Sequence, residues 1–381
     1  MEIRNVVARA VSVPLEGEAR AGFGRFVKRD TVLVRIETGD GLVGIGEAHH
    51  AKSPTVIEKL INANLRPLLL GRDPFQIELI WQTLYSQYSP ASPTHGVGSA
   101  GIIALSGVDI ALWDLLGKAL GQPLYNLLGG RYRPKIRAYV GGLALGWKGI
   151  EELLGEARRY VSEGFTALKL RIGRGVDEDV ELVRAAREGL GDKVDLMVDA
   201  NSRYSSAKEA IRLADRLAEL GVAWLEEPFP SDRLAPYRAL AKRARIPIAA
   251  GENHFTRFGF QPLIQWGLID IAQPDVTKSG GVTELRKIAA MADAWGISLA
   301  PHIYPSGVGM AAALHLLVSV PNALIAEYEP PGDNPLITGL LKNPIRAVDG
   351  FLEPPEGPGL GIEIDEGFVE DHPGIDGPAY V

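Results

Sequence analysis

Three carboxylates follow three consecutive apolar segments at nearly equal spacing, and this repeat constrains the fold more than any other feature. Asp199, Glu226 and Glu252 lie 27 and 26 residues apart, and each ends a short apolar run typical of a buried parallel strand. The interval is the length of one strand, one helix and two connecting loops. The repeat therefore predicts βα units whose strand ends bring the three carboxylates to one face.

The same alternation of strand and helix continues on both sides of these residues. Eight strands are expected, over residues 137–141, 167–172, 195–200, 222–226, 247–251, 269–273, 298–301 and 323–326. Amphipathic segments such as residues 151–162 and 206–220 lie between them. Eight such units in about 200 residues favour an α/β fold with a (β/α)8-type barrel, because right-handed crossovers leave few alternatives.

The first 130 residues follow a different pattern, with long strands before helices. Alternating segments predict antiparallel strands at residues 3–13, 30–37 and 42–47, and helical patterns follow at residues 53–65, 73–87 and 99–120. This order is typical of an α+β domain.

We therefore divide the chain into three parts. An N-terminal α+β domain is expected over residues 1–130 and the barrel over residues 131–329. A Pro- and Gly-rich C-terminal segment over residues 330–381, with one strand at residues 361–364, is expected to pack back on the first domain.

Charge and composition exclude several classes of protein. The net charge of −7 comes without a basic run, so no nucleic acid is expected as a partner. The absence of Cys excludes disulfides and thiol nucleophiles. The first residues lack the pattern of a signal peptide, and the nearly uncharged stretch at residues 97–113, which carries Asp109, is predicted to be a core helix rather than a membrane span. We expect a cytoplasmic protein without a membrane partner.

Polar residues also end the other predicted strands. Lys169 and Arg171 alternate on the second strand and should point to the same side, while Asp275, His302 and Glu327 end the sixth, seventh and eighth strands. Carboxylates that converge at one mouth repel each other unless a cation lies between them, and hard oxygen ligands suit Mg²⁺. The pattern indicates a metal-dependent active site.

These strand ends, together with the segments 41–47, 109–114 and 127–130, resemble the enolase superfamily and, within it, the mandelate racemase subgroup. The resemblance spans almost the entire chain. It implies an N-terminal α+β capping domain over a modified TIM (β/α)8-type barrel. It also implies a small carboxylate substrate, from which the proton α to the carboxylate is removed, and a homo-oligomer built from dimers, up to an octamer.

The resemblance assigns roles to the strand-end residues. It implies Mg²⁺ bound by Asp199, Glu226 and Glu252, which is the expected cofactor. It further implies that Asp275 and His302 form a catalytic dyad, with Glu327 as an acid near the substrate.

Arg171 departs from the pattern of the relatives, which usually carry Lys-x-Lys on this strand with the second Lys as a base. An Arg side chain is effectively always protonated and makes a poor base. We therefore predict that His302 is the sole proton-transfer group, while Lys169 and Glu327 stabilise the enediolate. If another base exists, Lys169 is the first suspect.

A single base on one face of the substrate favours elimination. We predict dehydration of an acid sugar, an aldonate or aldarate, to a 2-keto-3-deoxy acid. The alternatives are a racemase or epimerase of a 2-hydroxy or amino acid derivative, and a metal-binding scaffold without turnover.

Four residues are candidates for substrate binding. Arg25 lies in a Gly- and Arg-rich loop, and His49 and His50 lie in a loop that resembles the specificity loop of the family. Asn201 follows a predicted metal ligand, and it either supports that ligand or caps the following turn.

Two further charged residues lie close to the predicted site. We expect Glu227 to form a structural ion pair, since it points away from Glu226 if the strand continues. Lys278 is also assigned a structural role.

Overall fold

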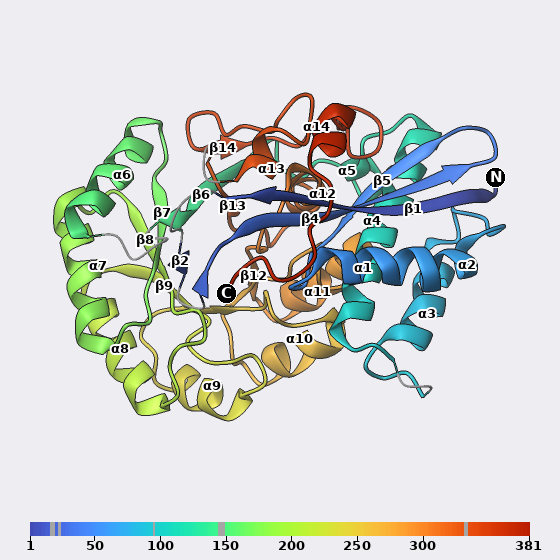
Figure 1. Cartoon of the computed structure of the whole chain (residues 1–381). Coiled ribbons are helices and arrows are strands. Elements are labelled where there is room, and N and C mark those ends of the chain that lie inside the picture. Colours follow the sequence, from blue (N-terminus) through green and yellow to red (C-terminus); the bar gives the residue numbers. More distant parts are fainter. Residues whose placement is uncertain (16–19, 22–23, 94–95, 144–148, 331–333) are drawn as a thin grey trace.

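A computed structural model describes the chain except for residues 16–19, 22–23, 94–95, 144–148 and 331–333 (Figure 1). Its N-terminal part contains an antiparallel sheet in the order β1-β4-β5, formed by β1 (Ile3–Pro14), β4 (Lys28–Thr38) and β5 (Val43–Ala48). The three predicted strands are therefore confirmed. The short strands β2 (Arg20–Ala21) and β3 (Gly24–Arg25) pair with each other.

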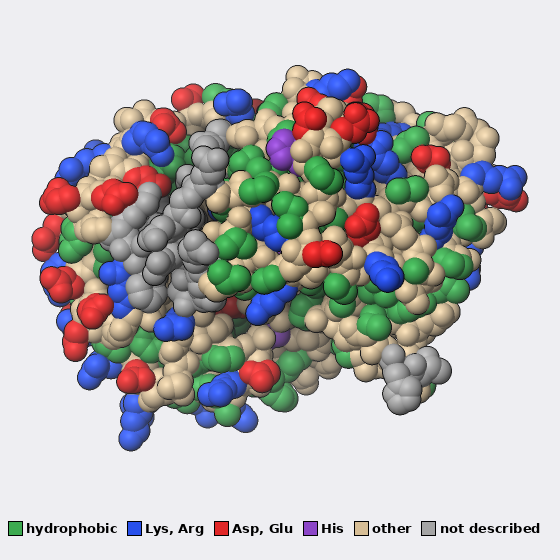
Figure 2. Space-filling model, viewed as in Figure 1, with side chains coloured by type: hydrophobic (Ala, Val, Ile, Leu, Met, Phe, Trp, Pro, Cys, Tyr) green, Lys and Arg blue, Asp and Glu red, His purple; other side chains and the backbone are tan. Residues whose placement is uncertain are grey.

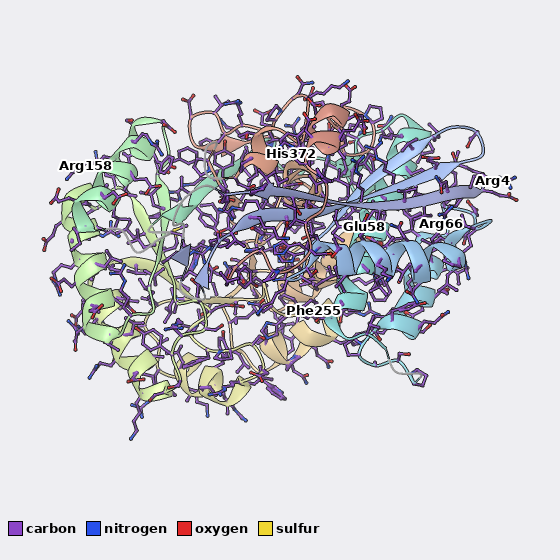
Figure 3. The ribbon with its side chains drawn as sticks, in the orientation of Figure 1. Arg4, Glu58, Arg66, Arg158, Phe255 and His372 are labelled. Carbon is purple, nitrogen blue, oxygen red and sulfur yellow. The ribbon has the colours of Figure 1, made fainter. Side chains whose placement is uncertain are left out.

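Helices of the N-terminal part lie beside and behind this sheet in the view of Figure 1. Along the chain they are α1 (Pro54–Leu60), the π-helical turn η1 (Ile61–Leu65), α2 (Arg66–Leu69), α3 (Ile77–Tyr88), α4 (Ser99–Leu120) and α5 (Leu124–Leu127). The helix predicted from residue 73 thus begins later, at Ile77. Arg66 on α2 and Glu58 on α1 lie at the surface of this part (Figure 3).

Two glycines allow β5 to lie directly against α4. A Cβ atom on Gly44 would collide with the carbonyl oxygen of Ala111, and one on Gly46 with that of Gly107. Only glycine permits so close an approach of a strand to a helix backbone. The α4 helix is long and apolar enough to cross a membrane, but 89% of its apolar window is buried inside the protein. It is a core helix, as the sequence predicted.

The following part forms a curled parallel sheet with the order β12-β11-β10-β9-β8-β7-β6-β13. In chain order the strands are β6 (Ile136–Leu143), β7 (Ala167–Arg171), β8 (Asp195–Asp199), β9 (Val222–Glu226), β10 (Ile248–Ala250), β11 (Ile271–Ala272), β12 (Ser298–Leu299) and β13 (Ala326–Tyr328). An isolated parallel bridge joins Leu299 to Ala323, which nearly closes the ring. This arrangement confirms the predicted α/β fold with an N-terminal antiparallel domain.

The last barrel strand was predicted too early. It runs over residues 326–328 instead of 323–326, because Ala323 makes only the isolated bridge with Leu299. Glu327 therefore lies within the strand, where it is paired in register with Tyr139 of β6.

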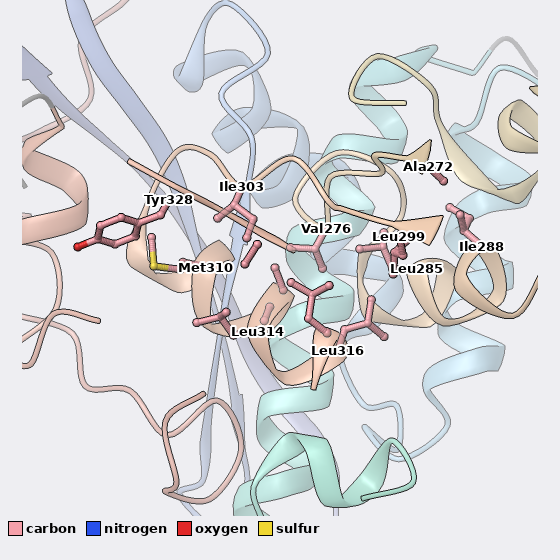
Figure 4. Close-up of a cluster of buried hydrophobic side chains, with 14 of the residues drawn as sticks. Ala272, Val276, Leu285, Ile288, Leu299, Ile303, Met310, Leu314, Leu316 and Tyr328 are labelled. Carbon is pink, nitrogen blue, oxygen red and sulfur yellow. The ribbon is translucent and has the colours of Figure 1, made fainter. Parts of the chain in front are cut away.

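Helices alternate with these strands and lie outside the sheet, as Figure 1 shows for α6 to α9. They are α6 (Ile150–Ser162), α7 (Val176–Leu190), α8 (Ala207–Glu219), α9 (Leu234–Ala241), α10 (Thr256–Gln265), α11 (Gly281–Ala294) and α12 (Gly307–Leu317). Figure 4 shows a buried apolar cluster from the sheet, α11 and α12, with Leu299, Leu285 and Leu314 among its members. Packing on this cluster holds the strand ends in place.

The chain beyond residue 330 contacts both parts of the molecule. It contains α13 (Pro335–Thr338), β14 (Phe351–Leu352) and α14 (Glu366–Asp371). β14 pairs with β6 of the barrel, whereas Pro373 and Tyr380 form bridges to Val11 and Phe26. The strand predicted at residues 361–364 is wrong: Ile364 makes only a bridge to Leu341, and the glycine at position 361 adopts a positive φ that interrupts extended structure.

Candidate active site

A cavity of about 210 Å³ lies where the strand ends face the N-terminal part. Parallel register brings the predicted residues of neighbouring strands side by side, with Arg171 paired to Asp199 and Asp199 paired to Glu226. The predicted residues that line the cavity are Arg171, Asn201, Glu252, His302, Glu327, His49 and His50. Lys169, Asp199, Glu226 and Asp275 are buried close beneath it. Arg25 lies in β3, and its side chain is outside the described part of the structure.

Lys169 is buried between two carboxylates on the barrel floor. Its Nζ lies 2.7 Å from Glu226 Oε1 and 2.8 Å from Glu327 Oε1. Burial alone would lower the pKa of Lys169, but the two carboxylates outweigh burial and raise this pKa above its usual value. The side chain is therefore held as a cation, next to the place where a substrate carboxylate would gain charge.

Asp199 is held by a cation and by the turn that follows it. Arg171 forms an ion pair with Asp199 Oδ2. The backbone N–H of Asn201 donates to Asp199 Oδ1 at 2.7 Å, and its side-chain amide donates to Oδ2 at 3.2 Å. Asn201 thus supports Asp199, and its positive φ of 44° is backbone strain of the kind found at functional sites.

His302 lies between two carboxylates. Its Nδ1 is 2.7 Å from Asp275 Oδ2, and its Nε2 is 3.3 Å from Glu252 Oε2. The backbone N–H and hydroxyl of Thr277 both donate to the other oxygen of Asp275, which fixes this carboxylate. Burial lowers the pKa of His302, but Glu252 and Asp275 outweigh it and raise the pKa to about 9. The two carboxylates therefore stabilise the imidazolium that forms when the neutral ring accepts a proton.

The donor set suits a hard divalent cation, although the described residues contain no preformed group of three His, Asp or Glu ligands. In this structure the carboxylates of Asp199, Glu226 and Glu252 face Arg171, Lys169 and His302 instead. The buried Oδ1 of Asn201, beside Asp199, has no hydrogen-bond partner. Carboxylate oxygens from neighbouring strand ends and an unsatisfied amide oxygen fit Mg²⁺ chemistry. Asp199, Glu226 and Glu252 would hold the ion.

Glu227 does not form the predicted ion pair with any described residue. Its carboxylate accepts a hydrogen bond from Asn253 Nδ2 at 2.9 Å, and its Oε1 is buried without a partner. Glu227 has a positive φ of 36°, so the chain leaves strand geometry at this residue. The prediction had assumed that the strand continues through Glu227. Burial and then the nearby Glu252 raise the pKa of Glu227 to about 8.

His49 and His50 stack on each other with ring centroids 4.2 Å apart, next to Tyr304. Burial lowers both pKa values, that of His50 to about 3, and neighbouring cations such as Lys278 lower them further. Both imidazoles are therefore neutral hydrogen-bonding groups in the cavity wall.

Several cavity residues were not recognised as functional in the sequence. Arg29 forms a buried ion pair with Glu329 at 2.9 Å and a hydrogen bond to Tyr304 at 3.1 Å. Lys278, which was assigned a structural role, and Tyr380 also line the cavity. Lys278 is recognisable from its place three residues after Asp275, whereas Tyr380 has no local signal because only the folded tail brings it there.

Two family models match the chain. Residues 3–129 match the N-terminal domain of mandelate racemase and muconate lactonizing enzyme, and residues 152–368 match the enolase C-terminal domain-like family. The chain belongs to the mandelate racemase and muconate lactonizing enzyme family of the enolase superfamily. The resemblance inferred from the strand ends is confirmed.

Relatives of this mandelate racemase family member include both isomerases and lyases. It is 38% identical to D-galactarolactone cycloisomerase from Agrobacterium fabrum and 36% identical to arabinonate dehydratase from Saccharolobus solfataricus, with 90% of both chains covered in each case. The crystal structure of a racemase from Streptomyces coelicolor A3(2) with bound magnesium is also similar, with 33% identity and a TM-score of 0.88 over 97% of this chain and 99% of that chain. The protein is an enzyme of the lyase or isomerase kind.

Proposed function

We propose that this enzyme dehydrates a sugar acid, an aldonate or aldarate, to a 2-keto-3-deoxy acid with Mg²⁺ as cofactor. The observation that carries the proposal is the His302–Asp275 pair: His302 and Glu327 line the cavity, while Asp275 and Lys169 are buried behind them in direct contact. A base and a fixed cation beside one small cavity are the groups needed to remove a proton next to a carboxylate and to stabilise the enediolate.

The chain's own residues account for the proton transfers. The neutral form of His302 takes the proton from the carbon next to the substrate carboxylate at Nε2, and Asp275 orients the ring and stabilises the imidazolium that results. The charge of Lys169 stabilises the enediolate oxygens. The imidazolium then returns its proton to the departing β-hydroxyl, which leaves as water, and the enol becomes the ketone. Bound Mg²⁺ would supply further positive charge to the substrate carboxylate.

Arg171 favours elimination over racemisation by two bases. Its guanidinium lies against Asp199 and stays protonated, so it cannot accept a proton on the second face of the substrate. A racemase or epimerase that uses two bases needs a competent group on each face. The residues of the site therefore favour a reaction in which one base, His302, acts on one face of the substrate.

Cycloisomerisation of a sugar-acid lactone is the second candidate. It is favoured by the similarity to a D-galactarolactone cycloisomerase. The same His302 would remove the α proton, after which the ring oxygen leaves in place of a free hydroxyl. The two reactions differ in their substrates and share the enediolate.

A panel of aldonates, aldarates and their lactones, incubated with the enzyme and Mg²⁺ in D₂O, tests both candidates. NMR identifies the product, and we expect a 2-keto-3-deoxy acid from at least one open-chain sugar acid. Turnover of lactones alone would favour cycloisomerisation. Inversion at the α carbon without a keto product would contradict both.

We further propose that the enzyme acts in the cytoplasm, and that it is a homo-oligomer built from dimers, as the family resemblance implies for the assembly. Sedimentation velocity on the purified protein tests the assembly state. A monomer at micromolar concentration would contradict it.

A further inference from the structure

Lys278 is a buried lysine in the cavity wall, and its charge acts to lower the pKa values of Glu227 and Glu252 without forming a direct salt bridge to either carboxylate. The residue is only 7% exposed. Its Nζ donates a hydrogen bond to the neutral amide oxygen of Asn253 at 3.2 Å. Among the residues that the structure describes, it forms no salt bridge. Burial of an ammonium group is costly unless an anion compensates it.

The other cations at the cavity differ in this respect. Lys169 pairs with Glu226 and Glu327, Arg171 pairs with Asp199, and Arg29 pairs with Glu329. Each of these charges is therefore neutralised by the protein itself. Lys278 has no such direct ion pair among the described residues, so its ammonium can still donate to an anion that enters the cavity.

His49 provides a second donor close to Lys278. Its backbone N–H donates to the carbonyl of Thr277 at 3.1 Å, which holds the His49 loop against the residue that precedes Lys278. The N–H of Ala51 donates to His49 Nδ1 at 3.0 Å, so the proton of the neutral ring is on Nε2. The imidazole is therefore a hydrogen-bond donor in the same cavity wall.

We propose that Lys278 and His49 bind a second acidic group of the substrate, so that the preferred substrate is a sugar diacid, an aldarate, rather than an aldonate. This inference rests on the proposed function and specifies its substrate class. The reacting carboxylate faces Lys169 and Glu327, and the second carboxylate lies against the ammonium and the imidazole N–H. Charged hydrogen bonds of this kind change affinity by about 10- to 100-fold.

The kinetic test compares a hexarate with the hexonate of the same configuration in the wild-type enzyme and in Lys278→Met. We expect the wild type to prefer the diacid, and the variant to lose about 10- to 100-fold in kcat/KM for the diacid through a higher KM. Its kcat/KM for the monoacid should stay within about twofold. Equal losses for both acids, or a wild-type preference for the monoacid, would overturn the proposal.

Two further variants control this comparison. Lys342→Met removes a surface lysine that pairs with Glu363, and it should change neither kcat/KM value. His49→Phe keeps an aromatic ring and removes the N–H donor, and it provides the test if Lys278→Met does not fold. It should reduce the preference for the diacid. An unchanged preference in folded His49→Phe counts against the site.

Calorimetry with glutarate and butyrate separates this inference from the proposed reaction. Neither acid has a hydroxyl to eliminate, and both offer one carboxylate to the Lys169 side. The difference between their affinities therefore measures the contribution of the second carboxylate of glutarate. We expect glutarate to bind the wild type about tenfold or more tightly than butyrate, and this difference to disappear in Lys278→Met. If no sugar acid is converted, the proposed function fails, while equal binding of glutarate and butyrate overturns the diacid site itself.

Discussion

The Lys169 ammonium lies 2.7 Å from the Glu226 carboxylate on the floor of the barrel, where both side chains are almost fully buried. Burial by itself would lower the pKa of Lys169, but the charges of Glu226 and Glu327 outweigh burial and raise this pKa. A lysine held as a cation stabilises negative charge and does not accept a proton. This relationship divides the work of the site: Lys169 stabilises charge, and His302 transfers the proton.

Replacement of His302 by Asn should therefore stop α-proton exchange. We expect a loss of about 10²- to 10⁴-fold in turnover, because the base is removed and Lys169 remains protonated. Deuterium incorporation into the substrate in D₂O measures the exchange directly. The control is His372→Asn, a change after α14 (Figure 3), which should retain activity. Exchange that persists in His302→Asn would show that a second base exists, with Lys169 the first candidate.

Removal of the metal should abolish turnover. Dialysis against EDTA is expected to give inactive but folded enzyme, and added Mg²⁺ should restore activity, because Asp199, Glu226 and Glu252 supply hard oxygen ligands. Glu252→Gln should raise the Mg²⁺ concentration needed for half-maximal activity by about tenfold or more. Glu353→Gln, at an exposed residue paired with Arg131, is the matched control. Full activity after EDTA would contradict a metal-dependent reaction.

Tyr380 should affect substrate binding from the C-terminal segment. Its ring packs edge-on against Phe26 with centroids 6.0 Å apart, and the side chain lines the cavity. Tyr380→Ala should raise KM by about threefold to tenfold with a smaller change in kcat, because an aromatic wall of the cavity is lost. Steady-state kinetics measures the effect. Tyr132→Ala, at a residue that is 67% exposed, should leave KM unchanged.

Asp109 should make the stability of the protein depend on pH. Burial raises its pKa to about 7, while its Oδ2 accepts a hydrogen bond from the N–H of Thr283 on α11. The unfolded chain releases this proton near pH 4, so the folded state loses stability as pH rises from about 4 to 7, by about 1.36 kcal/mol per unit of pKa shift at most.

Asp109→Asn removes this titration and tests it. Thermal or urea unfolding of the variant and the wild type at pH 5 and pH 8 measures the difference. The free energy of unfolding of the variant minus that of the wild type gives the difference at each pH. We expect this difference to be more favourable to the variant at pH 8 than at pH 5. A constant difference between the two proteins across this range would show that Asp109 does not titrate there.

Charged side chains on the surface are expected to contribute little to the effects predicted above for the buried residues. Figure 2 shows acidic and basic side chains interspersed over the visible face, and Arg158 on α6 points outward in Figure 3. Exposed pairs of this kind contribute little to stability. The predicted effects therefore arise from the buried charges at the cavity and between α4 and α11.

Regular spacing in the sequence was sufficient to predict the barrel and the residues at its strand ends. Parallel strands in register convert equal intervals along the chain into neighbouring positions in space, and Asp199 is indeed paired with Glu226. The close approach of β5 to α4 explains the glycines at positions 44 and 46. From the sequence alone, these glycines were noted only as part of a segment that resembles the family.

Tertiary structure decided which charges are already paired and which face the cavity. No local pattern distinguishes Arg29, which forms an ion pair with Glu329, from Lys278, whose Nζ hydrogen-bonds to the amide oxygen of Asn253. The contact of Tyr380 with Phe26 depends on the return of the tail to the N-terminal sheet. Periodicity determines where a strand ends, whereas the neutralisation of a buried charge depends on side chains from distant segments, and these meet only in the folded chain.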